Sequence, residues 1–156
     1  MDRGRLEAFS GIVWVNHHAL LQLIPRVTRT LLFLNLLLLM FVVLMPFATG
    51  TASEYLAAGG DSSRLASALW AATLLGMALG FAAMFEWVLR NGDARVPTGA
   101  VRQRARIRFG IGTLGYVAAV VLAFVDPVIT LVLIAAVAIY YLFEQTSAAA
   151  VPGAPE

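Results

Sequence analysis

The stretch that decides the fold is Leu31–Phe47, with the sequence LLFLNLLLLMFVVLMPF. It carries no charge, and Asn35 supplies its one strongly polar side chain. A helix on the surface of a water-soluble protein shows a polar face every three or four residues, and this stretch has none. A bilayer core about 30 Å thick needs roughly 20 apolar residues of helix, and this stretch lies near the lower bound. We therefore predict a membrane-spanning helix here.

The composition of the 156-residue chain also points to a membrane protein. Hydrophobic residues make up 60% of it and charged residues 13%, whereas a soluble domain carries about 25% charged residues. The net charge of +2 is too small to indicate a nucleic-acid partner. The chain has no cysteine, and it contains no phosphate-binding loop, nucleophile elbow or pair of catalytic acids. We predict an all-α, polytopic helical membrane protein without a cofactor or enzymatic chemistry.

Three further apolar segments complete the predicted membrane domain. They are Leu65–Leu89, Phe109–Val125 and Val128–Phe143. Together with the first stretch they give four transmembrane helices within a domain of residues 26–145. Residues 48–64 are rich in Gly, Ser and Ala and are predicted to form the first loop, and residues 90–108 the second. Residues 146–156 carry two prolines among small residues and are predicted to form a disordered cytoplasmic tail.

The N-terminal segment, residues 1–25, mixes apolar and polar side chains. Wound as a helix, the apolar residues between Ala8 and Ile24 share one stripe, and most of the polar residues fall on the other side. This pattern is typical of a helix that lies in the membrane interface or packs against other spans. Pro25 ends it. We predict a short amphipathic or partial helix.

The arginines predict the orientation of the chain. Arg26 and Arg29 precede the first span, and residues 90–108 hold six arginines against one aspartate, whereas the loop at 48–64 has a net charge of −1. The positive-inside rule therefore places both basic segments in the cytoplasm. We predict a multi-pass protein of the cell membrane with a cytoplasmic C-terminus. The N-terminus is cytoplasmic if residues 8–24 stay at the interface, and outside if they cross.

Small residues recur at every fourth position of the second predicted span, at Ala68, Ala72, Gly76 and Gly80. The two glycines complete a GxxxG pattern, which lets two helices approach closely in a membrane. The pattern predicts a helix-packing surface. Alanine-rich spans also produce such ridges by chance, and this alternative stays open.

Two strings near the N-terminus stand out. They are Arg5-Leu6-Glu7-Ala8-Phe9-Ser10 and Trp14-Val15-Asn16-His17-His18. They resemble the Arg-x-x-x-Phe-Ser-Asp and Trp-x-Asn-His-His signatures of the transmembrane-protein-175 family of potassium channels. From Gly11 to about Phe143 the chain also resembles the family's second to sixth helices, including the leucine-rich helix that ends in Pro-Phe and the arginine-rich loop.

The resemblance implies a potassium-selective leak channel subunit, with the lipid bilayer, potassium ions and further copies of the same chain as partners. In the family the two signatures are thought to hydrogen-bond to each other. The network implied here consists of Arg5, Phe9, Ser10, Trp14, Asn16, His17 and His18. In this chain Ser10 is followed directly by Gly11, where the family has its aspartate, the rest of the pore-lining first helix and most of the second. We therefore predict that conduction is impaired.

Three hypotheses follow. The chain conducts as an oligomer, or it keeps the family scaffold without the pore helix and does not conduct unaided, or it is an unrelated four-helix membrane protein. We favour the second hypothesis over the first. Such a chain is an accessory or scaffold protein, or an engineered or degenerate deletion variant.

Few polar side chains within the four spans are candidates for lining a pore. They are Asn35, Thr73, Glu86, Thr113 and Thr130. Glu86 lies one turn before Arg90, and we expect these two to pair. We expect Asn35 to make an interhelical hydrogen bond. Neighbouring positions of a helix point about 100° apart, so His17 and His18 cannot chelate one ion together, and we predict no metal site.

Overall fold

The computed structural model of the chain describes residues 28–91 and 99–149. Within these ranges the chain forms α-helices with short turns at residues 57–59 and 124–126, and no strand occurs there. The helices are α2 (Arg29–Leu56), α3 (Gly60–Asn91), α4 (Gly99–Ala123) and α5 (Pro127–Ala149). The predicted all-α fold class is confirmed. The predicted amphipathic helix within residues 1–25 lies outside the described residues.

The lengths of the helices fit a membrane protein. By length and composition, α2, α3 and the Arg102–Ala123 part of α4 are each able to cross a bilayer. The apolar part of α5 within the described residues, Pro127–Tyr141, is shorter. The prediction of a polytopic membrane protein is confirmed.

Helix α2 is longer than the sequence predicts. Thr28 caps its start, because the Thr28 hydroxyl accepts a hydrogen bond from the Leu31 N–H at 3.3 Å. The helix contains Pro46 and continues to Leu56, so the prediction of a loop over residues 48–64 is wrong for most of that range. The hydroxyls of Thr49 and Thr51 donate to backbone carbonyls one turn earlier, which satisfies these polar side chains on a helix.

Helices α4 and α5 are also longer than the sequence predicts. Residues 99–108 were predicted to be part of a loop, but they form the first turns of α4. That prediction is wrong because arginine is a good helix former, so a run of arginines does not end a helix. At the other end of the chain, α5 continues to Ala149. It therefore includes the first residues of the segment that was predicted to be disordered from residue 146.

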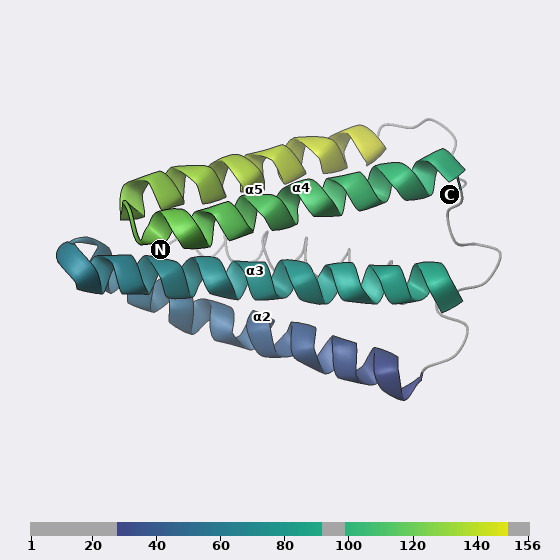
Figure 1. Cartoon of the computed structure of the whole chain (residues 1–156), viewed down its shortest axis with the longest axis horizontal. Coiled ribbons are helices and arrows are strands. Elements are labelled where there is room, and N and C mark those ends of the chain that lie inside the picture. The colour runs from purple at the N-terminus through teal and green to yellow at the C-terminus, as the bar shows by residue number, and fades with distance from the viewer. Residues whose placement is uncertain (1–27, 92–98, 150–156) are drawn as a thin grey trace.

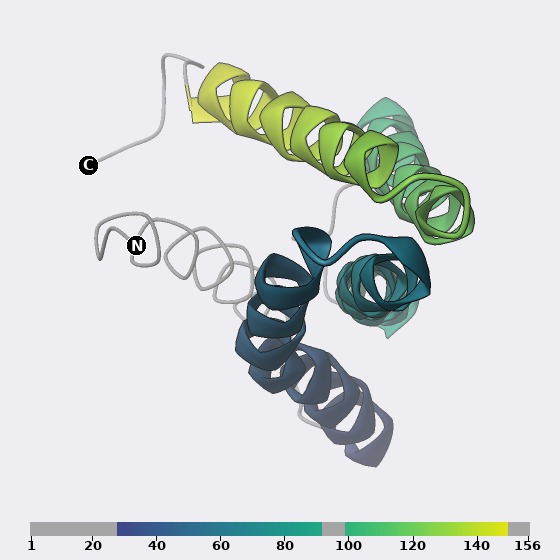
Figure 2. The ribbon, with the colours of Figure 1, turned by 90° about the vertical axis from the view of Figure 1, so that its left-hand side faces the viewer.

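The helices pack side by side in chain order, as Figure 1 shows. Seen from the end in Figure 2, α3 lies between α2 and α4, and α5 lies beside α4. One apolar cluster joins α2 to α3, and a second joins α3 to α4 and α5. The buried members of the first are Leu31, Leu38, Met77, Met84 and Val88. Those of the second are Ala71, Leu74, Ala119 and Ile134. Helix α3 is therefore the central element of the described bundle.

The turn between α4 and α5 is fixed by Asp126. Its carboxylate accepts hydrogen bonds from the N–H groups of Val128 at 2.7 Å and Ile129 at 3.2 Å, and Pro127 takes the first helical position. An aspartate before a proline is a strong signal for the start of a helix. The sequence therefore determines locally that α5 folds back beside α4.

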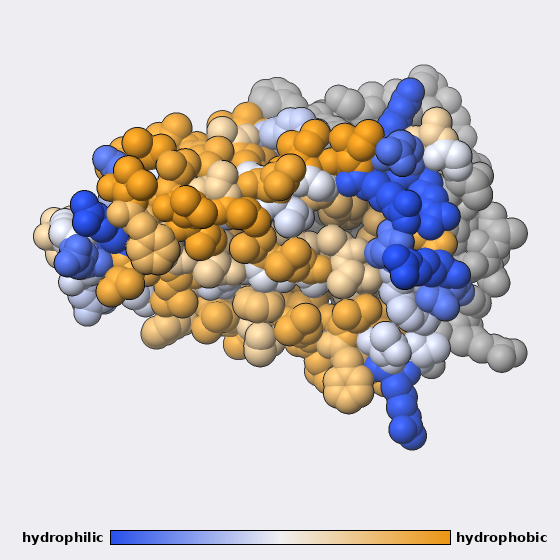
Figure 3. All heavy atoms as spheres, viewed as in Figure 1, coloured by the Kyte–Doolittle hydropathy of each residue, from blue (hydrophilic) through white to orange (hydrophobic). Residues whose placement is uncertain are grey.

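The outer faces of the helices are apolar and exposed. Large side chains such as Phe33, Val43, Leu114 and Val132 are each more than 60% exposed. Figure 3 shows a broad apolar band across the helices, with hydrophilic side chains gathered at its two ends. Apolar patches of this extent are rare on soluble monomers. The band is the surface that a multi-pass protein presents to lipid tails.

Candidate functional site

The structure places the predicted small-residue ridge on the central helix α3. Ala68, Gly76 and Gly80 are buried, whereas Ala72 is exposed. Residues four apart on an α-helix advance by about 40° around its axis, so a ridge of this spacing winds around the helix and cannot face one neighbour throughout. The glycines are the part of the ridge that meets α2.

The contact between the glycines and α2 is close. A Cβ atom on Gly80 would lie 3.2 Å from the Leu38 Cα atom, and a Cβ on Gly76 would overlap the Phe41 ring. A larger side chain at Gly80 would press against the backbone of α2, and one at Gly76 would displace the Phe41 ring. The two glycines therefore allow α2 and α3 to approach, as small residues do between membrane helices.

The residues of the implied motif network lie outside the described residues. They are Arg5, Phe9, Ser10, Trp14, Asn16, His17 and His18. Their hydrogen-bond network stays a prediction.

The threonines in the spans use their hydroxyls within the protein. Thr73 donates to the Leu69 carbonyl at 2.8 Å, and Thr113 to the Phe109 carbonyl at 2.9 Å. Thr130 is fully buried, and its hydroxyl lies 3.2 Å from the Asp126 carbonyl oxygen. Asn35 is half-buried on α2. These threonine hydroxyls bond to backbone carbonyls, which is the common fate of threonine within a helix.

Glu86 sits at the arginine-rich end of α3 and pairs with two arginines. Arg90 Nε donates to its carboxylate at 2.9 Å, which confirms the pairing expected from the sequence. Arg106 Nε donates to the second oxygen of the same carboxylate at 3.0 Å, and a further Arg106 nitrogen donates to the first oxygen. Sequence reasoning missed Arg106, because its approach depends on how α4 lies against α3.

An open groove of about 410 Å³ runs from this ion pair along the seam between α3 and α4. Its walls are Leu79, Ala82, Phe85 and Glu86 from α3, and Arg106, Phe109, Gly110, Thr113 and Leu114 from α4. The Phe85 and Phe109 rings pack with their centroids 4.9 Å apart. The groove is thus charged at one end and apolar over the rest of its length.

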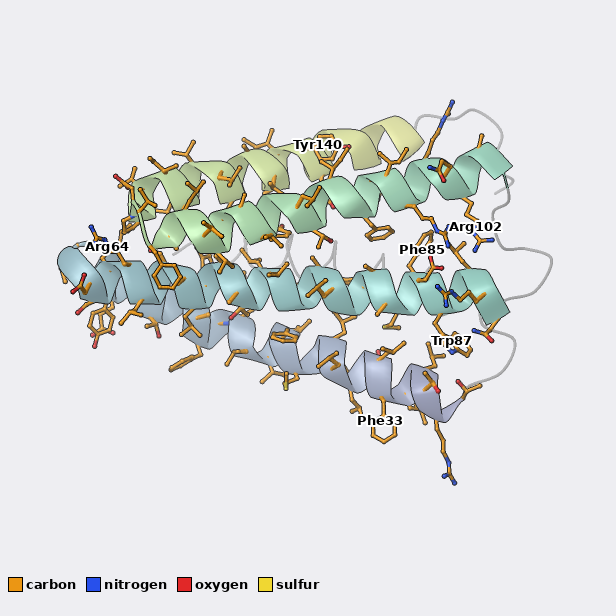
Figure 4. The ribbon with its side chains drawn as sticks, in the orientation of Figure 1. Phe33, Arg64, Phe85, Trp87, Arg102 and Tyr140 are labelled. Carbon is orange, nitrogen blue, oxygen red and sulfur yellow. The ribbon has the colours of Figure 1, made fainter. Side chains whose placement is uncertain are left out.

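The charges are distributed unequally between the two ends of the bundle. Figure 4 shows Arg102 and Trp87 at one end and Arg64 at the other. Arg64 pairs with Asp61 at 3.3 Å, whereas the opposite end carries the arginines of α4. Within residues 28–91 and 99–149 there is no group of three or more His, Cys, Asp or Glu side chains that could hold a metal ion.

The fold and these charges define a class of protein, a multi-pass helical membrane protein with one strongly basic end. Comparison with known proteins gives the family. A family model described as the endosomal/lysosomal potassium channel TMEM175 matches residues 8–46. This range contains the Trp14–His18 string and much of α2, and it does not contain Arg5.

Two relatives extend the likeness over most of the chain. A potassium channel of Streptomyces collinus is 43% identical over 138 residues, which is 86% of this chain and 66% of the relative. A potassium channel of Chamaesiphon minutus is 30% identical over 150 residues, 91% of this chain and 71% of the relative. No solved structure matches the chain. The chain belongs to the TMEM175 family of potassium channels.

Proposed function

We propose that this protein is a potassium-channel subunit that assembles with further copies of itself in the cell membrane. In this proposal α2–α5 form the scaffold, and the N-terminal motif segment keeps only the start of the helix that lines the ion path in the family. The observation that carries the proposal is the 30% identity to a named potassium channel across 71% of that channel's length. Its role is the transport of an ion across a bilayer rather than an enzymatic reaction.

The polar groups of the described spans favour a scaffold role for α2–α5. A potassium pore needs oxygen atoms that replace the hydration shell of the ion, or a hydrophobic constriction that gates a wet passage. The Thr73, Thr113 and Thr130 hydroxyls donate to backbone carbonyls. Both oxygens of Glu86 accept from arginines. The burial of Thr73 and Thr130 inside the bundle and the ion pairs of Glu86 therefore support a structural role for these three side chains.

We further propose that the chain conducts poorly without help. Ser10 is followed directly by Gly11, where the family signature continues into an aspartate and the rest of a pore-lining helix. The chain also spans 66% of the length of the Streptomyces relative that it matches. A subunit with a scaffold and without a complete pore helix retains the fold and loses the lining of the ion path.

The second candidate function is that of a non-conducting accessory or scaffold protein of the same family. The same junction at Ser10 and Gly11 favours it. The two candidates differ in one property. An impaired channel regains conduction when the missing helix is restored, whereas an accessory protein acts through a partner and does not.

A potassium-flux assay in liposomes tests both candidates. We expect the purified chain to give no flux above protein-free vesicles. A variant with a family-like helix inserted between Ser10 and Gly11 should restore flux, and a scrambled insert of equal length is the matched control. Flux by the unmodified chain that substitutions on one helix face abolish would contradict impaired conduction. Absence of rescue, with insertion of the protein verified, would favour the accessory role.

We also propose that the basic end of the bundle and both termini lie in the cytoplasm. The arginines of α4 and the acidic Asp126 at the opposite end support this orientation through the positive-inside rule. An Asp2→Cys variant tests the N-terminus, because the chain has no other cysteine. We expect no reaction with an impermeant maleimide on intact cells, and a reaction there would show that residues 8–24 cross the membrane.

A further inference from the structure

The groove between α3 and α4 has an apolar length and a cationic mouth, and this combination matches the two parts of a phospholipid. We propose that it binds an anionic phospholipid, with an acyl chain along the groove and the phosphate against the guanidinium groups of Arg102 and Arg106. This inference is independent of whether the chain conducts potassium.

The shape of the groove suits an acyl chain. From Glu86 at the mouth to Leu79 at the far end it extends over seven residue steps of α3, which is roughly 10 Å along a helix. Leu79 is 50% exposed and Leu114 is 70% exposed, so the far end opens onto the apolar band that faces lipid. A soluble ligand would leave this apolar end unfilled, whereas an acyl chain continues from the groove into the bilayer.

The charges at the mouth suit a phosphate. Arg90 and Arg106 both contact Glu86, so one carboxylate is set against two guanidinium groups, and Arg102 lies one turn before Arg106 on α4. The pair with Glu86 uses two N–H groups of Arg106, and a guanidinium carries five. Arginine binds phosphate with paired, charge-assisted hydrogen bonds. The mouth therefore has a net positive charge and donors for a phosphate.

Arg102 lies one turn from Arg106 on the same side of α4, beside the mouth and outside the lining of the groove. Its Nε atom is buried, and it has no hydrogen-bond partner in the described part of the chain. Because this Nε atom is already covered, a phosphate would contact the terminal nitrogens of the half-buried Arg102 side chain. Figure 4 shows Arg102 and Phe85 at the same end of the seam between α3 and α4. A phosphate at the mouth would thus lie where the charged end of the groove meets its aromatic wall.

The rival explanation is that these arginines act through their charge alone. Basic residues at the end of a span hold it in the cytoplasm and attract anionic lipids without a defined site. Arg104 separates the two explanations, because it is exposed and lies two residues from both Arg102 and Arg106, on the other side of α4. If the attraction is diffuse, loss of the Arg104 charge should weaken lipid binding as much as loss of a neighbouring arginine. If there is a defined site, loss of the Arg104 charge should have little effect.

Native mass spectrometry of the full chain in detergent, titrated with phosphatidylglycerol or phosphatidylcholine, tests the proposal. We expect phosphatidylglycerol to bind about tenfold more tightly than phosphatidylcholine, since each arginine near an anionic lipid contributes measurably. The Arg102→Gln/Arg106→Gln variant should lose about this tenfold preference, and Arg104→Gln should stay within about twofold of the parent. Equal binding of the two lipids, or an equal loss for Arg104→Gln, would overturn the proposal.

A second variant tests the groove itself. Gly110 lines it, and a Cβ atom added there would meet nothing within 4 Å, so Gly110→Leu should fill the groove without disturbing the fold. We expect it to weaken phosphatidylglycerol binding, and we expect glycerol 3-phosphate not to displace the lipid. Unchanged lipid binding by Gly110→Leu would overturn the proposal that the acyl chain lies in the groove. Full displacement by glycerol 3-phosphate would show a phosphate site without a lipid. Should the double arginine variant lose its helical circular dichroism, Arg102→Gln and Gly110→Leu still decide the question.

Discussion

The two seams of α3 differ in how they are held. Against α2, the glycines at 76 and 80 bring the helices together until Leu38 and Phe41 touch them. Against α4, the arginine end is joined by Glu86 and Arg106, and an open groove lies beside the contact. Close packing therefore holds α3 against α2, whereas an ion pair holds the arginine end of α3 against α4. Close packing is difficult to change without loss of stability, whereas the charged and open seam leaves room for a ligand.

The largest effect is expected at the closed seam. Gly80→Leu should lower the free energy of unfolding by about 3 kcal/mol, because the new side chain meets the Leu38 backbone and α2 must move. Unfolding in mixed micelles, followed by circular dichroism, measures it. Gly50→Leu is the matched control, since a Cβ there meets nothing within 4 Å. Equal losses for the two variants would contradict a specific contact at Gly80.

An intermediate effect is expected between α4 and α5. The Tyr141 hydroxyl donates to the Arg108 carbonyl at 3.2 Å and covers Gly112, where an added Cβ would overlap the phenol oxygen. Gly112→Ala should cost about 2 kcal/mol through this overlap, and Tyr141→Phe about 1 kcal/mol through the lost hydrogen bond.

The effects of Gly112→Ala and Tyr141→Phe on the free energy of unfolding should not be additive. Tyr141→Phe removes the phenol oxygen, which lies nearest to the new methyl group, while the ring carbons Cζ and Cε2 stay 2.6 and 2.7 Å from it. The overlap is relieved in part, so the double variant should be somewhat more stable than the sum of the single losses allows. The same unfolding measurement on the four proteins of the cycle gives the coupling. Strict additivity would contradict a contact between the phenol oxygen and a methyl group at position 112.

The smallest effect is expected at the charged seam. Glu86 and its arginines are partly exposed, and exposed ion pairs contribute little because solvent and salt screen them. Glu86→Gln should lower the melting temperature only slightly at low salt and not measurably at high salt, whereas the loss in Gly80→Leu should not depend on salt. If the melting temperature of Glu86→Gln stayed lower at high salt, the Glu86 carboxylate would stabilise the contact between α3 and α4 more than an exposed ion pair does.

The contrast between the seams also explains what the sequence could predict. The membrane fold could be predicted, because the charge-free run around Asn35 indicates a transmembrane helix by itself. A candidate packing surface could be predicted in the same way from the spacing of the glycines at 76 and 80. The helix ends were missed around Thr49 and Thr51, because hydroxyls that bond to backbone carbonyls let polar residues continue a helix. Arg106 and the groove could not be predicted, since they depend on how α3 and α4 align after the chain reverses.

The central proposal is that these helices cross a bilayer with the arginine end inside and the Asp61 end outside. Single cysteines at two exposed positions test it, Ser62→Cys near the start of α3 and Gln103→Cys on α4, since the chain has no cysteine of its own. On intact cells we expect an impermeant maleimide to label Ser62→Cys, and to label Gln103→Cys only after the membrane is opened. Labelling of Gln103→Cys on intact cells would contradict the account.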